Sequence, residues 1–150
     1  MKPLILLIAV FTISAVTAKF STGNWNLVFS GNLAMCIMLC FTAFGHFKFS
    51  KGMTMMLPGV IPFKTQLVFF TGIAEIVFGL ALSLPYLRYW AGLILIALFI
   101  LMLHANIYAA FNHINYETAA YDGKGPGYLW FRVPMQVVFI LWVLYFSVKK

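Results

Sequence analysis

The stretch TGIAEIVFG, residues 71–79, lies inside an apolar run that covers residues 66–84. A run of about twenty apolar residues is long enough to cross the hydrocarbon core of a bilayer as a helix. Glu75 lies in the middle of this run, and an acid at that depth is costly unless it faces other helices and finds a partner. The other two acids, Glu117 and Asp122, lie in a polar loop. We therefore expect the chain to pack around Glu75.

The composition is that of a membrane protein. Hydrophobic residues make up 63% of the 150 residues and charged residues 9%, whereas about a quarter of the residues in a soluble domain are charged. Ten basic and three acidic residues give a net charge of +7. The basic residues stand singly or in pairs at the ends of apolar runs, where lysine and arginine reach the lipid headgroups. Because they form no single basic stripe, we do not expect nucleic-acid binding.

Five apolar runs predict five transmembrane helices. The predicted spans are residues 3–18, 25–46, 66–84, 90–111 and 128–148. The first run ends in small residues, as a signal peptide does before its cleavage site. Lys19 and Trp25 follow as interface anchors, which favours a retained helix.

Residues 47–64 interrupt the apolar pattern between the second and third spans. Lysines alternate there with methionines, and Pro58 and Pro62 prevent a continuous helix. The pattern predicts a short amphipathic segment in the headgroup zone. We thus predict an all-α, polytopic membrane protein, in which an N-terminal helix within residues 1–24, a possible signal anchor, precedes a four-helix bundle within residues 25–150.

Five antiparallel spans place four helix ends on one side of the membrane, which we call the loop face. These are the end of the second span, the start of the third, the end of the fourth and the start of the fifth. Glu75 lies roughly 15 Å from this face and Arg132 about 5 Å, at 1.5 Å per residue. Two long side chains can close the remaining gap, so we expect Arg132 to partner Glu75, as a structural contact or in a pocket open to the loop face. A buried carboxyl without a close cation would instead keep its proton.

The helical periodicity assigns directions to the nearby polar residues. Arg132 and Gln136 are four residues apart and share a face. His104 and Asn106 are two residues apart and cannot both point inward. Asn106 shares its face with small residues suited to close packing, so we expect it to be the inward one. No convergent histidine or cysteine pattern occurs, and we therefore expect no metal site.

Several short motifs follow one another within residues 28–146. They are Phe44-Gly45-His46-Phe47, Met56-Leu57-Pro58, Ile61-Pro62, Thr71-Gly72 with Glu75, Ala105-Asn106-Ile107-Tyr108-Ala109-Ala110, and Trp130-Phe131-Arg132 with Pro134 and Gln136. Taken in this order, they resemble the DoxX-like family of small bacterial membrane proteins. The resemblance implies a four-helix bundle in the bacterial cytoplasmic membrane, with Glu75, Asn106, Arg132 and His46 at a common site. The family takes its name from a subunit of a thiosulfate:quinone oxidoreductase. His104 stands where the family pattern has a proline.

These observations lead to one leading hypothesis and two alternatives. We expect a membrane subunit or small enzyme of a redox system that handles a quinone-like or other apolar molecule at the loop face, next to membrane lipid and a redox partner protein. In this hypothesis the catalytic residues are Glu75 and Arg132, and the ligand-binding residues are His46, Thr71, Asn106, Trp130 and Gln136. The alternatives are a non-enzymatic scaffold or transporter accessory subunit, and a lipid-modifying isomerase that uses the buried acid.

Overall fold

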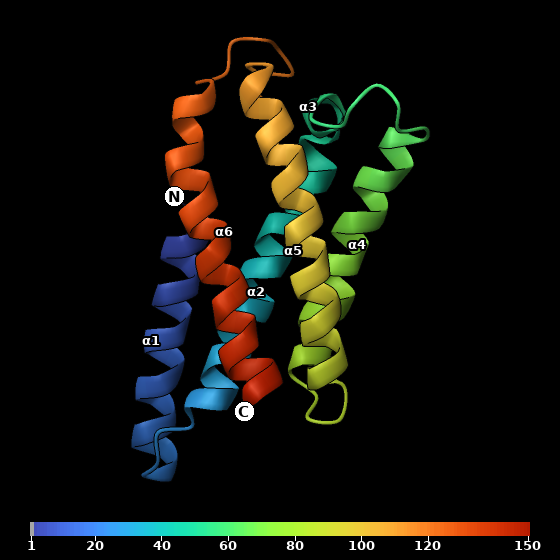
Figure 1. Ribbon diagram of the computed structural model, residues 1–150. Coiled ribbons are helices and arrows are strands. Elements are labelled where there is room, and N and C mark those ends of the chain that lie inside the picture. The colour runs from blue at the N-terminus through green and yellow to red at the C-terminus, as the bar shows by residue number, and fades with distance from the viewer. Residues whose placement is uncertain (1) are drawn as a thin grey trace.

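The computed structural model describes residues 2–150 as an all-α bundle (Figure 1). Five of its helices are long and apolar enough to span a membrane, which confirms the predicted fold class. The elements are α1 (Lys2–Thr22), α2 (Leu27–Lys48), the short α3 (Ser50–Met55), α4 (Lys64–Leu82), α5 (Arg88–Phe111), a 3-10 turn η1 (Pro126–Tyr128), α6 (Leu129–Val143) and a closing π-helix η2 (Leu144–Lys149).

The four helices α2, α4, α5 and α6 alternate in direction, and α1 packs on the outside (Figure 1). One end of the bundle carries α3, residues 56–63 and the loop at residues 112–125; this end is the loop face. Helix α1 lies along the opposite half of the bundle, where Phe11 contacts the rings of Trp142 and Phe146. The site described below therefore involves α2 to α6 and not α1.

The most extensive helix–helix contact in the bundle joins α2 to α4, and two glycines lie in it. A Cβ atom added at Gly72 would lie 2.9 Å from the Cβ atom of His46, and one at Gly79 would lie 3.3 Å from Leu39. Small residues allow helix backbones to approach closely in lipid. Because Gly72, Glu75 and Gly79 follow a helical spacing, the same face of α4 turns Glu75 toward α2.

The segment predicted to lie in the headgroup zone is only partly helical. Helix α3 covers Ser50–Met55, and residues 56–63 form an irregular connection around Pro58 and Pro62. Phe63 then adopts a left-handed backbone conformation directly before α4. The Lys64 ammonium group donates to the Leu57 carbonyl at 2.9 Å, and this contact folds the connection back over the start of α4.

The end of the bundle away from the loop face has its own polar contacts. The Asn32 amide donates to the Phe146 carbonyl at 2.9 Å, and the Ser147 hydroxyl donates to Asn32 at 2.6 Å. The Trp142 indole donates to the Gly31 carbonyl at 3.0 Å. These bonds satisfy buried polar groups and fix η2 against α2, so we read this cluster as structural.

Candidate functional site

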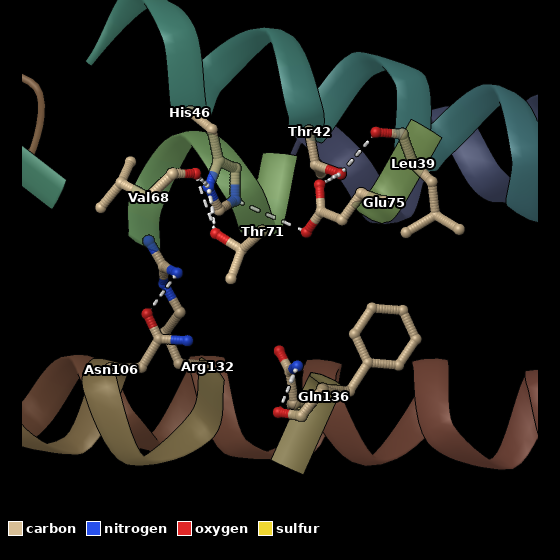
Figure 2. A network of polar contacts seen from close by, with 10 residues as sticks. Leu39, Thr42, His46, Val68, Thr71, Glu75, Asn106, Arg132 and Gln136 are labelled. Atoms are coloured by element: carbon tan, nitrogen blue, oxygen red, sulfur yellow. Dashed lines mark hydrogen bonds and ion pairs between the residues drawn. The ribbon is translucent and has the colours of Figure 1, made fainter. Parts of the chain in front are cut away.

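Glu75 is buried between α4 and α2, and only 1% of its surface is exposed. Its two carboxyl oxygens have separate partners on α2 (Figure 2). The Thr42 hydroxyl donates to Oε2 at 2.9 Å, and His46 Nε2 lies 3.5 Å from Oε1. Thr42 and His46 are four residues apart and share one face of α2, so a single helix supplies both partners.

The second nitrogen of His46 determines where the protons lie. Nδ1 is 3.1 Å from the Val68 carbonyl and 3.2 Å from the Thr71 hydroxyl. A carbonyl oxygen only accepts, so Nδ1 carries a proton. Nε2 then faces Oε1 of Glu75 across 3.5 Å. A proton held between these two atoms would leave the pair neutral overall whichever atom carried it, which would suit its place inside a membrane protein.

Arg132 does not partner Glu75, and the structure corrects that expectation. Its guanidinium group donates to the Asn106 side-chain oxygen at 2.8 Å. It also lies between two tyrosine rings, 5.3 Å from the Tyr116 centroid and 5.1 Å from the Tyr128 centroid. Across residues 2–150, the contact of Glu75 with His46 is the one pairing of an acid with a basic side chain. Depth along the membrane normal brings Arg132 within reach of Glu75, but the two helices turn these side chains toward different partners.

The loop at residues 112–125 holds Tyr116 in place. The Tyr116 backbone lies directly on Gly52 of α3, where no larger residue would fit. Its ring packs edge-to-face on Phe49 at 5.8 Å. Burial raises the pKa of the Tyr116 phenol, and the nearby Arg132 charge opposes this rise. The phenol therefore stays neutral at physiological pH, as a face for the arginine cation.

An apolar cavity of about 340 Å³ lies beneath the loop face. His46 and Thr71 border it from the side of α2 and α4, while Asn106 and Arg132 border it from the side of α5 and α6. Figure 2 shows the two pairs on opposite sides of the view, with the Arg132 guanidinium pointing toward α4. The other lining residues are Met53, Met56, Leu57, Pro58, Ile61, Leu67, Val68, Leu98, Leu101, Met102, His104 and Ala105. No acidic residue lines the cavity, so its polar groups suit an electron-rich oxygen of a ligand.

Three residues expected at the site do not line this cavity. The Glu75 carboxyl lies behind His46 and Thr71, so it acts on the cavity through them. Gln136 is buried and donates to the Phe99 carbonyl at 3.0 Å, which fixes α6 to α5. Trp130 is 84% exposed on the outer surface of α6. Neither Gln136 nor Trp130 is therefore placed to bind a ligand in the cavity.

The two polar residues near the end of α5 point in different directions, as the helical spacing predicts. Asn106 is buried, whereas His104 is exposed and bonds back to the Ile100 carbonyl at 2.9 Å. His104 still reaches the rim of the cavity. The described part of the chain contains no group of three His, Cys, Asp or Glu side chains that could hold a metal ion.

Sequence reasoning missed Thr42, Tyr116 and Tyr128. Thr42 had a usable signal, because it precedes His46 by one helical turn on α2. The two tyrosines lie in or beside an irregular loop, where no periodicity indicates a direction.

Residues 35–147 match the sequence model of a domain of unknown function, DUF8561. This chain belongs to the DUF8561 family. The match begins within α2 and ends within η2, so the DUF8561 region contains every residue that lines the cavity. No curated protein and no solved structure matches the chain.

Proposed function

We propose that this protein binds a quinone-like molecule in the loop-face cavity, as a subunit or small enzyme of a membrane redox system. One observation carries the proposal: polar side chains enter an otherwise apolar cavity from two opposite walls. A para-quinone is a flat, apolar ring with a carbonyl oxygen at each of two opposite ends. Apolar cavities with a few convergent polar groups are the usual form of small-molecule sites.

The hydrogen-bonding capacity of each wall fits this ligand. Asn106 uses its oxygen to accept from Arg132, which leaves its amide N–H groups as oriented donors. On the other wall the Thr71 hydroxyl lies 3.2 Å from His46 Nδ1 and donates to the Val68 carbonyl at 2.9 Å. Because His46 Nδ1 also donates to that carbonyl, the Thr71 hydrogen can turn to a ligand oxygen without leaving the carbonyl unpaired. Donors on both sides would hold both quinone oxygens, and the methionines and leucines would contact the ring.

Glu75 has a positioning role in this proposal. It holds the far side of His46 and thereby fixes which nitrogen of the ring faces Thr71. This arrangement also favours the quinone hypothesis over the isomerase alternative, because an isomerase of the kind considered needs its acid against the ligand. The resemblance to the DoxX-like family supports the redox setting, a redox partner protein and the bacterial cytoplasmic membrane.

Calorimetric titration of the detergent-purified protein with a short-chain para-benzoquinone tests the proposal. We expect saturable binding that weakens by about tenfold in Thr71→Val and in Asn106→Leu, since each loses one hydrogen bond of about 1 kcal/mol or more. Gln136→Leu is the control, because it also removes a buried amide but not one that lines the cavity. The proposal fails if the wild type binds no quinone, or if the control weakens binding as much as the two cavity variants. Stable co-purification of a protein partner without any quinone binding would favour the scaffold alternative.

A further inference from the structure

Two leucines that line the cavity also lie on the outer surface of the bundle. Leu67 on α4 is 37% exposed and Leu101 on α5 is 67% exposed. Their neighbours in the cavity, Val68 and Leu98, are buried. The cavity therefore runs from the interior to an opening between α4 and α5. Figure 1 shows these two helices joined by a short connection at one end and set apart toward the loop face.

The opening lies at the depth of the lipid chains. Leu101 is ten residues before Phe111, the last residue of α5, which corresponds to about 15 Å of helix. The hydrocarbon core of a bilayer is about 30 Å thick, so this position is close to its middle. Leu67 is three residues after the start of α4, about 5 Å from the loop-face end of that helix. The opening between the two leucines therefore extends from near the headgroups to about the middle of the bilayer, where exposed leucines contact acyl chains.

The side of the cavity toward the aqueous phase is covered. Met53 of α3 and the irregular residues Met56, Leu57, Pro58 and Ile61 line the cavity from the loop face. The bond from Lys64 to the Leu57 carbonyl fixes this cover to α4, and the Tyr116 backbone presses on α3 at Gly52. Access through the opening between α4 and α5 needs none of these contacts to break.

We infer that the ligand is a membrane-dissolved lipid with an aliphatic chain, which enters from the loop-face leaflet between α4 and α5. Its polar head lies near Asn106 and Arg132, and its chain leaves the cavity between Leu67 and Leu101. The identity of the head group rests on the proposed function, whereas the chain subsite rests on the opening itself. The lining of leucine and methionine side chains suits a flexible alkyl or isoprenoid chain.

Photolabelling tests this inference without using a quinone. The protein is placed in lipid nanodiscs with a long-chain alcohol that carries a diazirine in its chain, and the labelled residues are mapped by mass spectrometry. Chains that only surround the bundle label exposed positions such as Ile100, which is 44% exposed and does not line the cavity. A chain inside the cavity also labels Met56 and Leu98, both buried in the structure.

Blocking variants and a matched control complete the experiment. We expect Leu101→Trp to lower labelling of Met56 and Leu98 by about tenfold, equivalent to about 1.4 kcal/mol of lost occupancy. The neighbouring Ile100→Trp should leave this labelling unchanged. Leu67→Trp should act like Leu101→Trp from the opposite side of the opening. Both blocking variants should keep Cys36, a buried free thiol, protected from a thiol reagent, which verifies folding.

Failure of this inference differs from failure of the proposed function. Absent labelling of Met56 and Leu98, or labelling equal in Leu101→Trp and Ile100→Trp, overturns the side opening even if quinone binds. The expected labelling together with no quinone binding overturns the quinone head group and retains the chain subsite.

Discussion

Replacement of Glu75 by alanine and by glutamine should have very different effects on stability. The carboxyl group makes two contacts, with Thr42 at 2.9 Å and with His46 at 3.5 Å. Alanine removes both contacts. A glutamine amide has nearly the same shape, so its oxygen can accept from Thr42 while its N–H group donates to His46 Nε2.

The contacts of the partners set the magnitude of the difference. His46 Nδ1 already donates to the Val68 carbonyl. Alanine at position 75 therefore leaves Nε2 buried without a partner, which costs about 1–3 kcal/mol of stability. Loss of a buried methylene group adds roughly 0.8 kcal/mol. The single hydrogen of the Thr42 hydroxyl can turn to the Leu39 carbonyl at 3.0 Å, so the loss of this partner contributes little. We therefore expect Glu75→Ala to cost about 2–4 kcal/mol, and Glu75→Gln less than about 1 kcal/mol, because it loses no hydrogen bond.

The chain contains its own reporter of unfolding. Cys36 is buried and Cys40 is exposed, and both thiols are free. In a Cys40→Ser background, a thiol-reactive dye modifies Cys36 only when the bundle opens. Titration with sodium dodecyl sulfate in mild detergent micelles, followed by the rate of dye incorporation, gives the relative free energies of unfolding of the two variants and the parent.

Equal losses of stability in Glu75→Gln and Glu75→Ala would refute the reasoning. Such a result would mean that a carboxylate charge, and not a set of shared hydrogen bonds, holds α4 to α2. The reasoning would also be wrong if both variants lost less than about 0.5 kcal/mol of stability, which is the size of an ordinary surface change. Glu75 would then contribute nothing to the packing of the bundle.

Three further predictions concern the loop and its arginine. Gly52→Ala should destabilise the protein by about 1–3 kcal/mol in the dodecyl sulfate titration, because the added Cβ overlaps the Tyr116 carbonyl. The control Gly59→Ala should have no effect, because open space surrounds this position. A double-mutant cycle of Arg132→Ala and Asn106→Ala should give a coupling of about 1.5–3 kcal/mol, and a value near zero would contradict the 2.8 Å bond. Burial raises the pKa of Tyr116. The difference in phenolate absorbance between the wild type and Tyr116→Phe should therefore rise only above pH 10. The free energy of unfolding that this group contributes should be complete below pH 10 and be lost above it.

The fold follows from the sequence because a bilayer restricts the solutions. Apolar runs of spanning length must be helices, since only a helix satisfies its backbone within the membrane as a single segment. The helix limits differ by a few residues where side-chain chemistry intervenes. Helix α4 begins at Lys64 and not at residue 66, because the lysine extends back to the Leu57 carbonyl and not away from the protein.

The partner of Glu75 shows what a depth argument omits. Distance along the membrane normal made Arg132 reachable, but it gave no rotation about the helix axis. The sequence does indicate this rotation. Gly72 and Gly79 flank Glu75 at helical spacing, and such small residues mark a face that packs closely against another helix. Had that face been assigned to α2, Thr42 and His46 would have followed. The position of Tyr116 had no comparable signal, because it depends on how an irregular loop folds over α3.

The two walls of the cavity differ in how they are held, and this has a consequence for function. The wall of His46 and Thr71 lies on the close α2–α4 contact, fixed by Gly72 and by the bonds of Glu75. The opposite wall depends on Arg132, whose guanidinium contacts Tyr116 and Tyr128 on its other side. A movement of the loop at residues 112–125 thus changes the position of Arg132 while His46 stays in place. If the cavity binds a quinone as proposed, a protein that binds the loop at the membrane surface would alter the affinity through Arg132. Tyr116→Leu should then weaken quinone binding in the calorimetric titration without changing the contact between α2 and α4.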